Sequence, residues 1–351
     1  MGTGVVGAAG SSVEQALRFD GDALWALDQT RLPWQEIELA LRSADEVADA
    51  IRRLSIRGAP LIGVAAGYGV ALALTRDPGH LEQACKTLRG ARPTAVNLAH
   101  AVTRVRAAAL SAPPGEQAAA ALAQAQAIDA EEQAASAELA RHGAHLLSAA
   151  GRILTHCNTG MLAAPGRGTA LAVIAELAQR GSLELALATE SRPLLQGARL
   201  TVWELARLGI AHQLLVDSAA PGLIAAGEVD AVIVGCDRVA ANGDVANKVG
   251  TYGLALAAAA AQIPFVVAGP TSTIDPSCPT GAQIEIEERG EEEVRSVVTN
   301  GDPGRWQLTL PGTRCRNPAF DLTPASLVTA LVTERGVARP ARGESVLGLL
   351  P

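Results

Sequence analysis

The feature that most constrains the fold is a regular alternation of apolar runs and helix-like segments after Ala149. Short apolar runs bounded by turn residues are typical of buried strands in a parallel sheet, and they occupy Arg152–His156, Glu184–Ala188, His212–Val216, Val229–Gly235 and Pro264–Ala268. Helices are expected between these runs at Gly168–Gln179, Leu195–Leu208, Ala219–Ala226 and Lys248–Gln262. Each strand and helix together span about 30 residues, the length of a βαβ crossover. The pattern therefore predicts a parallel sheet with helices on both faces.

The residues before Ala149 have a different, mostly helical pattern. Phe19–Trp25 has the turn residues of a β-hairpin. Ser43-Ala-Asp-Glu46 is a capping-box pattern that begins a helix reaching Leu54. Further helices are expected at Leu61–Leu74, Leu81–Leu88, Thr94–Leu110 and Gly115–Ala149, and a last helix is expected at Thr323–Arg335.

Length and pattern together predict two domains and an α/β fold class. At 351 residues the chain exceeds the usual size of a single hydrophobic core. We expect a helical N-terminal domain with a small β-hairpin region at residues 1–125. The parallel-sheet domain is expected at residues 126–351.

Charge and cysteine content exclude several kinds of partner. The net charge of −7 and the pI near 5.5 lack the basic face that nucleic-acid binding requires, so we expect no nucleic acid partner. The 5 cysteines are scattered and never spaced C-x-x-C, which indicates neither a disulfide framework nor a zinc site. We therefore expect a reduced, cytoplasmic protein with no metal or other cofactor. The first residues lack the features of a signal peptide, and no run resembles an uninterrupted transmembrane helix, so no membrane partner is expected.

Two reactive side chains are expected at the carboxyl ends of predicted strands. Cys157 follows the strand at 152–156, and Asp237 follows the strand at 229–235. In an open α/β sheet the ligand binds outside these strand ends, so distant residues can converge on one cleft. A thiol facing a carboxyl group suggests proton-transfer chemistry, with a partly buried Asp held protonated as a general acid. The simpler alternatives are an inert buried cysteine and a loop-capping Asp237 paired with Arg238.

Two arginines that precede predicted helices are candidates for binding an anion. Arg57-Gly58-Ala59-Pro60 joins two helices, and the N-terminus of the second helix offers free N–H groups beside a guanidinium. A helix–helix turn with an exposed arginine explains this motif equally well. Arg92 also precedes a helix, where a structural helix start is nearly as good an explanation. Only the two arginines taken together favour a phosphate-binding site over these structural explanations.

Two further polar segments lie at the same edge of the predicted sheet. Gln196 would begin the helix at 195–208, from which it could hydrogen-bond a sugar hydroxyl. Asn242–Lys248 belongs to the densest polar segment of an otherwise apolar chain. Lys248 is expected to begin the next helix, where its amine and the local N–H groups would suit a phosphate or an oxyanion.

In this order the segments resemble the methylthioribose-1-phosphate isomerase family of methionine salvage. That family shares a superfamily with the α, β and δ regulatory subunits of eukaryotic translation initiation factor two-B. The resemblance runs from Leu27 to Pro324, nearly the whole chain, and each segment alone is only modestly specific. The segments that carry it are Ile56–Pro60, Arg92–Asn97, Leu154–Gly160, Thr189–Thr201 and Val232–Lys248.

The resemblance implies an activity and a set of site residues. The implied enzyme is an aldose–ketose isomerase that converts 5-methylthioribose 1-phosphate, a small phosphorylated sugar, to 5-methylthioribulose 1-phosphate. It implies a Rossmann-like catalytic domain at residues 126–351, a homodimer, and no metal or nucleotide. The implied catalytic pair is Cys157 and Asp237. The implied substrate-binding residues are Arg57, Gly58, Ala59, Arg92, Gln196, Asn247 and Lys248.

Two other functions stay open at this point. One is a non-catalytic regulatory subunit on the same scaffold, because fold does not determine function; the presence of both Cys157 and Asp237 argues against it. The other is an isomerase for a different 1-phosphorylated pentose, either 5-deoxyribose 1-phosphate or ribose 1,5-bisphosphate. A second phosphate would require further cations near C5 of the sugar, and none is identifiable from sequence. A methylthio group requires only an apolar pocket.

Overall fold

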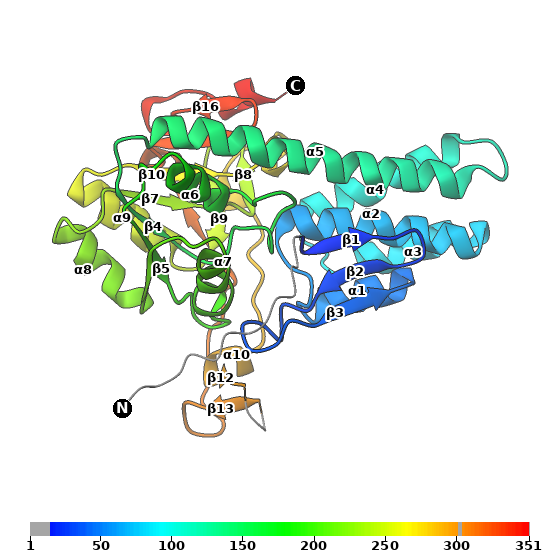
Figure 1. The fold of residues 1–351 in the computed structure, drawn as a ribbon, viewed down its shortest axis with the longest axis horizontal. Helices are drawn as coiled ribbons and strands as arrows, with labels where there is room; N and C mark the ends of the chain where they lie inside the picture. The colour runs from blue at the N-terminus through cyan, green and yellow to red at the C-terminus, as the bar shows by residue number, and fades with distance from the viewer. Residues whose placement is uncertain (1–14, 301–303, 351) are drawn as a thin grey trace.

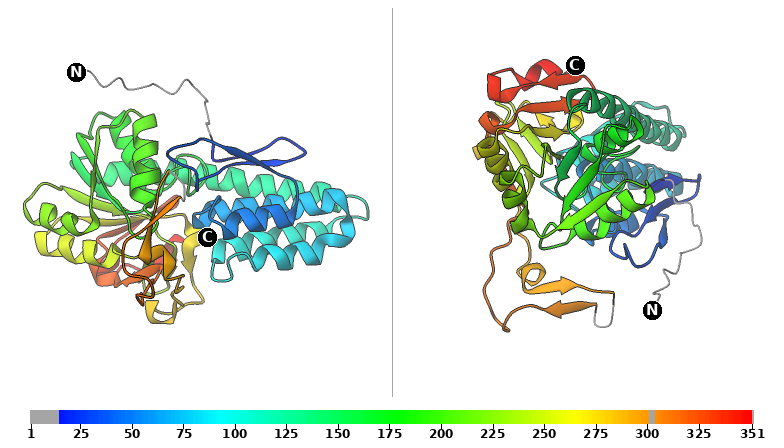
Figure 2. Two further views of the ribbon diagram at one scale, coloured as in Figure 1. Left: turned by 90° about the horizontal axis from the view of Figure 1, so that it is seen from below. Right: turned by 60° about the vertical axis from the view of Figure 1, so that its left-hand side comes forward.

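The computed structural model describes residues 15–300 and 304–350, so the prediction about a signal peptide lies outside the described residues. Two lobes lie side by side, a helical one and one built around a sheet (Figures 1 and 2). A single long helix, α5, crosses from the first lobe to the second. The predicted mixed α/β class, with a helical N-terminal region and a mostly parallel sheet, is confirmed.

The N-terminal lobe packs helices around α2 and covers them with a small antiparallel sheet. Its elements are β1 (Leu17–Phe19), β2 (Leu24–Leu27), β3 (Glu38–Leu41), α1 (Ala44–Arg52), α2 (Ala59–Arg76), α3 (Leu81–Arg89) and α4 (Val96–Ser111). The predicted hairpin is the β1–β2 pair. At the start of α1, Ser43 Oγ accepts a hydrogen bond from Glu46 N at 3.2 Å. The Glu46 carboxylate bonds Arg42 N rather than Ser43 N, so only half of the expected capping box forms.

Helix α2 is the core of this lobe. Its 18 residues are long and apolar enough to cross a membrane, which corrects the expectation that no such run exists. However, 83% of the helix is buried among its neighbours, as in the core helix of a globular domain. It packs mainly against α4 and α5, and Gly63 and Gly67 allow the close approach.

Helix α5 (Gln117–Leu146) belongs to both lobes. Ala121, Ala125 and Ile128 are buried in the core of the helical lobe. Leu139 and Ala144 are buried in a core of the sheet lobe. The predicted boundary between residues 125 and 126 falls inside this helix and stays a prediction.

The second lobe is built on a seven-stranded sheet in the order β16-β15-β10-β7-β4-β5-β6. All neighbours are parallel except β15 and β16. The strands are β4 (Arg152–Thr155), β5 (Leu185–Thr189), β6 (His212–Leu215), β7 (Ala231–Val234), β10 (Phe265–Ala268), β15 (Ala330–Thr333) and β16 (Gly336–Ala338). Each of the strands predicted between residues 152 and 268 is present.

Helices cover both faces of this sheet, as the alternating pattern predicts. Neighbouring strand residues Ile153 and Leu154 point into different cores. The core around Ile153 contains side chains from α5, α6 (Ala170–Gln179) and α7 (Val202–Arg207). The core around Leu154 contains side chains from α8 (Ala220–Ala225) and α9 (Thr251–Ala261).

The predicted helix at Thr323–Arg335 is wrong. Along its described residues this segment contains the end of β14 (Phe320–Thr323), a 3₁₀ turn and all of β15. β15 lies between β10 and β16, and each of its residues is buried. A strand buried on both faces has a continuous apolar run, which periodicity does not distinguish from a helical segment.

Lys248 does not begin a helix either. It is the last residue of β9 (Val245–Lys248), which forms a hairpin with β8 (Arg238–Ala240) and also pairs with β14. With β11 (Ile274–Asp275) these strands form a separate four-stranded sheet. Helix α9 begins only at Thr251, after Gly250 turns the chain with φ 110°.

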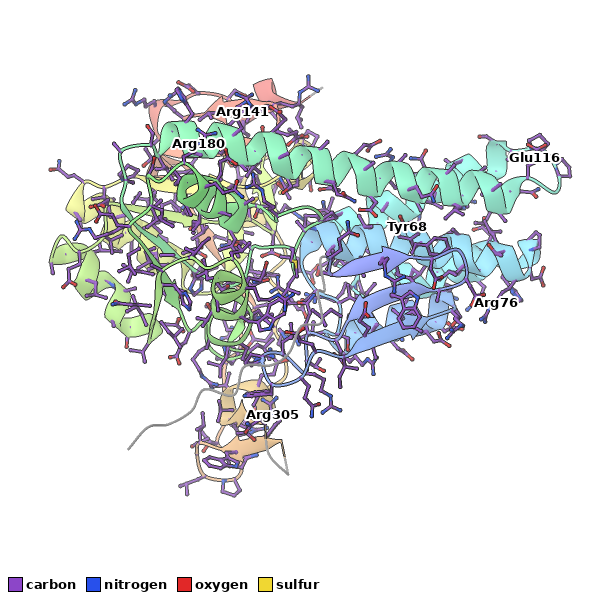
Figure 3. The ribbon with its side chains drawn as sticks, in the orientation of Figure 1. Tyr68, Arg76, Glu116, Arg141, Arg180 and Arg305 are labelled. Carbon is purple, nitrogen blue, oxygen red and sulfur yellow. The ribbon has the colours of Figure 1, made fainter. Side chains whose placement is uncertain are left out.

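A small arm projects from the sheet lobe. It contains α10 (Glu292–Arg295), β12 (Ser296–Val298) and β13 (Arg305–Gln307). In Figure 3, Arg305 marks this arm, and Arg76 and Glu116 mark the far end of the helical lobe. The acidic run Glu285–Glu293 has the charges typical of a solvated helix start or surface loop, but it leads into the arm and is partly buried.

Candidate active site

All of the residues predicted for the site line one cavity of about 110 Å³ where the two lobes meet. The helical lobe contributes the start of α2 and the loop before α4. The sheet lobe contributes the loops after β4, β5 and β7, together with the end of β9. The residues brought together are Arg57, Gly58, Ala59, Arg92, Cys157, Gln196, Asp237, Asn247 and Lys248. Their individual roles stay predictions.

The cavity opens where the strand order of the sheet reverses. The chain proceeds from β4 through β5 to β6 in one direction, then returns so that β7 lies on the other side of β4. In an open α/β sheet this point leaves a crevice at the carboxyl ends of the strands. Cys157 follows β4 and Asp237 follows β7, so both lie at this crevice.

Cys157 has a left-handed backbone, with φ 62°. This conformation is unfavourable for a residue with a side chain and persists only where surrounding contacts hold it. Cys157 N donates to Ser191 Oγ at 2.7 Å, and the Cys157 carbonyl accepts from Thr201 Oγ1 at 2.5 Å. Ser191 and Leu195 are also left-handed, and one turn of π-helix follows at Gly197–Thr201. The loops after β4 and β5 therefore hold each other in an uncommon geometry.

His156 precedes Cys157, and both of its ring nitrogens are occupied by hydrogen bonds within the protein, so it is not placed to bind a metal. Its ring is buried, with Nε2 2.9 Å from the Val249 carbonyl and Nδ1 2.6 Å from Thr189 Oγ1. A carbonyl only accepts, so Nε2 carries the proton and Nδ1 accepts from Thr189. Burial lowers the pKa of His156 to about 4, so the ring is neutral at physiological pH.

Asp237 and Lys248 are ionisable groups without partners of their own. Within the described residues, neither the Asp237 carboxyl group nor Lys248 Nζ makes a hydrogen bond or an ion pair. Burial raises the pKa of Asp237 to about 6, against the opposing effect of the nearby cations Arg92, Arg57 and Lys248. Burial also lowers the pKa of Lys248, while the nearby acidic groups Cys157 and Glu293 oppose this. Buried groups of this kind are costly and cluster at functional sites.

The start of α2 provides the anion-binding features expected of it. Gly58 has φ 94°, and a Cβ there would collide with the backbone of Ala163, so only glycine allows this approach. Among the described residues, no backbone acceptor pairs with the N–H groups of Gly58 and Ala59. Arg57 lies beside them and donates to Oδ1 and to the backbone carbonyl of Asn158, each at 2.9 Å.

Arg92 and Gln196 lie in different environments. Arg92 forms a salt bridge with Glu287 at 2.8 Å, so a carboxylate already neutralises part of its charge. Gln196 is 8% exposed, and its Oε1 has no hydrogen-bond partner among the described residues. A ligand hydroxyl in the cavity could satisfy this acceptor.

Sequence reasoning missed other residues of the cavity. Arg289 lines it, although it lies in the acidic run that the sequence predicts to be a solvated surface. It forms salt bridges with Glu287 at 2.9 Å and Glu293 at 2.5 Å. Its position as the only basic residue of that run was the available signal. Asn158, Phe320 and Cys236 also line the cavity, and Cys236 Sγ lies 3.3 Å from Thr273 Oγ1.

Comparison with known proteins gives consistent matches over nearly the whole chain. The Initiation factor 2 subunit family matches residues 55–340. The methylthioribose-1-phosphate isomerase of Anaeromyxobacter sp. (strain K) is 52% identical over 320 residues, which are 91% of each chain.

Two solved structures match equally well. The 5-methylthioribose 1-phosphate isomerase of Pyrococcus horikoshii OT3 has a TM-score of 0.84 and 38% identity, over 93% of this chain and 92% of that chain. A structure described as the translation initiation factor eIF-2B, subunit delta, from A. fulgidus has the same TM-score of 0.84 and 38% identity, over 96% and 99%. These matches extend across both lobes and the cavity between them. The chain belongs to the methylthioribose-1-phosphate isomerase family, within the Initiation factor 2 subunit family.

Proposed function

We propose that this protein is an aldose–ketose isomerase that converts 5-methylthioribose 1-phosphate to 5-methylthioribulose 1-phosphate in methionine salvage. The observation that carries the proposal is the cavity at the point where the strand order of the sheet reverses. It combines an acid with a raised pKa, a thiol and an unpaired amine beside an anion-binding helix start. The proposal agrees with the name of a relative that is 52% identical in sequence, a methylthioribose-1-phosphate isomerase.

The phosphate is proposed to bind at the start of α2. Of the cations that line the cavity, Arg57 and Lys248 have no carboxylate partner in the described structure, and the N–H groups of Gly58 and Ala59 lie beside Arg57. A dianionic phosphate favours such a combination of helix N-terminus and cations. Arg92 is proposed to contribute less, because Glu287 already pairs with it.

Asp237 is proposed to open the sugar ring. The substrate is a furanose whose anomeric oxygen carries phosphate, so it cannot open spontaneously to an aldehyde. A proton from Asp237 to the ring oxygen allows the bond between C1 and that oxygen to break, leaving positive charge on C1. A pKa near 6 keeps a useful fraction of this acid protonated close to neutral pH. The resulting carboxylate then accepts the proton of the C2 hydroxyl as the ketone forms.

The hydrogen on C2 must move to C1, and two routes do this with the same balance of atoms. In the first, a Cys157 thiolate removes the C2 proton, an enol phosphate forms, and the thiol returns the proton to C1. In the second, hydride moves directly from C2 to C1 and Cys157 stabilises the changing charge. Deuterium from D₂O at C1 of the product would identify the proton route.

The charges in the cavity favour a substrate with a single phosphate. Ribose 1,5-bisphosphate would need a second group of free cations. Arg289 is the additional cation of this cavity, and two carboxylates already bind it. Leu54, Leu194 and Phe320 give the same cavity apolar surface for a methylthio group.

Activity measurements test the proposal directly. Purified protein should convert 5-methylthioribose 1-phosphate with a higher kcat/KM than 5-deoxyribose 1-phosphate and ribose 1,5-bisphosphate, assayed side by side. Absence of turnover with all three sugars would support a regulatory subunit instead. A preference for the bisphosphate would show that the assignment of the C5 pocket is wrong.

We also propose a cytoplasmic homodimer. Exposed apolar side chains on the arm support a self-association surface, since Trp306, Leu308 and Leu310 are 66%, 57% and 78% exposed. Sedimentation velocity should give the mass of a dimer. Trp306→Ala should weaken that dimer, whereas a monomeric wild-type protein would contradict the proposal.

A further inference from the structure

The carboxylate of Glu204 lies beneath the loop that follows β4, and the mechanism above gives it no role. Glu204 is on α7 and is 4% exposed. Its Oε1 accepts from Asn158 Nδ2 at 2.6 Å, and its Oε2 accepts from Met161 N at 2.7 Å. A Cβ at Gly160 would collide with this carboxylate, so the loop closes tightly around it. A buried carboxylate held in this way is expensive to maintain unless it has a use.

The contacts of Glu204 determine which way the Asn158 amide faces. A carboxylate only accepts hydrogen bonds, so the amide nitrogen of Asn158 must face Glu204. The amide oxygen then faces Arg57, and Arg57 Nη1 donates to it at 2.9 Å. A guanidinium only donates, so a reversed amide would set donor against donor on this side as well. The second contact, from Arg57 Nη2 to the Asn158 carbonyl at 2.9 Å, fixes the plane of the guanidinium.

We propose that Glu204 is a positioning residue for the substrate phosphate, acting through Asn158 to hold the guanidinium of Arg57 at the cavity. The inference rests on the proposed function, because it takes Arg57 to be a phosphate ligand. Glu204 itself does not line the cavity. Burial raises the pKa of Glu204 to about 7, while donors from Asn158 and Met161 and the charge of Arg57 oppose this rise. Every one of these partners suits the carboxylate form, which is the form that orients the amide.

The first test is Glu204→Gln, which preserves the size of the side chain. Its one acceptor oxygen stays with Met161 N, a backbone donor that cannot reverse, so its NH₂ group faces the Asn158 NH₂ group. Asn158 then reverses and presents a donor to Arg57. The Kd for inorganic phosphate should rise about tenfold or more, since a hydrogen bond to a charged group is disturbed. The KM for substrate should rise in proportion, with a smaller change in kcat. Glu176→Gln is the matched control, because Glu176 is salt-bridged on α6 away from the cavity, and it should bind phosphate like the wild type.

The decisive test reverses the polarity of the pair. In the double variant Asn158→Asp with Glu204→Gln, the carboxylate at position 158 accepts from both Arg57 and the amide at position 204, and the total charge is unchanged. Its Kd for phosphate should lie below the Kd of Glu204→Gln and of Asn158→Asp, but above the wild-type value, because the carboxylate at position 158 now pairs with Arg57. A role limited to filling the core would not produce this rescue. The double variant also keeps the test valid if Glu204→Gln alone does not fold, and thermal midpoints of all variants identify that case.

Arg57→Ala separates the possible outcomes. If Arg57→Ala weakens phosphate binding but Glu204→Gln does not, or if the double variant is no better than Glu204→Gln, the positioning role is wrong. If Arg57→Ala itself binds phosphate like the wild type, the proposed phosphate site is wrong and the positioning role falls with it. The inference is supported if Arg57→Ala and Glu204→Gln both bind phosphate weakly and the double variant binds phosphate more tightly than Glu204→Gln.

Discussion

Cys157 and Asp237 leave the sheet from adjacent strands, β4 and β7, on the two sides of the point where the strand order reverses. The ladder pairs Thr155 with Ile233, so the two strands end at nearly the same level. Beyond this level their loops diverge toward opposite halves of the sheet and leave a crevice between them. Residues that are far apart in the sequence thus become opposite walls of one cavity.

This relationship predicts that Cys157 and Asp237 act as one catalytic unit. Cys157→Ser and Asp237→Asn should each lower kcat by roughly 10²-fold or more, the usual contribution of a positioned acid–base group. The double variant should be scarcely slower than either single one, because groups that act together are not additive. Steady-state kinetics on the purified variants measure this, with phosphate binding as a check on folding. Cys315→Ser, a thiol outside the cavity, should remain fully active.

The pKa of Asp237 predicts the pH dependence of the reaction. Because Asp237 must be protonated to open the ring, kcat/KM should fall as pH rises above about 6, approaching tenfold per pH unit. Bound dianionic phosphate adds negative charge nearby, so the same decline in kcat should occur at higher pH. Arg92→Ala should also move the decline upward, because Arg92 is the largest charge that lowers the pKa of Asp237. A profile in which Asp237→Asn keeps the same decline would identify another group as the acid.

The two arginines of the cavity should not be equivalent. Arg57 donates only to neutral oxygens of Asn158, whereas Arg92 is paired with Glu287. Arg57→Ala should therefore weaken phosphate binding more than Arg92→Ala, by roughly 1.5–3 kcal/mol for the loss of one charged contact. Isothermal titration with inorganic phosphate provides the measurement. Equal losses would mean that Glu287 does not compete with the ligand for Arg92.

The turn before α2 should tolerate no side chain at Gly58. Gly58→Ala combines a left-handed φ of 94° with a collision against the Ala163 backbone. Gly21 has a similar φ of 103° but open space around it. Gly21→Ala should cost about 1 kcal/mol of unfolding free energy, and Gly58→Ala clearly more. Urea denaturation compares the two, and equal losses would show that the close contact carries no energy.

Much of the fold could be predicted because its strands are short and bounded by turns. β4, β5, β6, β7 and β10 match the apolar runs of the sequence within two residues. β15 was missed although it is as fully buried as β7 and β10, because Thr323 and Gly336, which flank the segment, have the pattern of a helix cap and a helix end. The prediction that Lys248 begins a helix was also wrong. Lys248 ends β9, whose pairing with β8 is a tertiary contact that the helix-like residues after it do not reveal.

The site was predictable where its residues follow strands or begin helices. Cys157, Asp237 and Arg57 stand next to such boundaries, and the cavity contains all three. Neither Glu204 nor Arg289 could be placed at the site from the sequence, because the position of each relative to the cavity depends on how segments distant in the chain pack together. Glu204 accepts a hydrogen bond from Asn158, which is 46 residues away in the sequence. Arg289 reaches the cavity only because its segment folds back beside the residues that form the rest of the lining. Such contacts depend on packing and leave no local pattern.

The long helix α5 determines where the two halves of the cavity meet. Arg57 and Arg92 are carried by one lobe and the reactive pair by the other, and α5 is buried in the cores of both. One residue inserted between Ile128 and Leu139 would rotate the far half of the helix by about 100° and shift it by about 1.5 Å. Related chains should therefore vary in length at the outer turn between α4 and α5, near Gly115, and keep the inner segment constant. The length of α5 therefore helps to set the distance between Asp237 and the anion-binding residues Arg57 and Arg92.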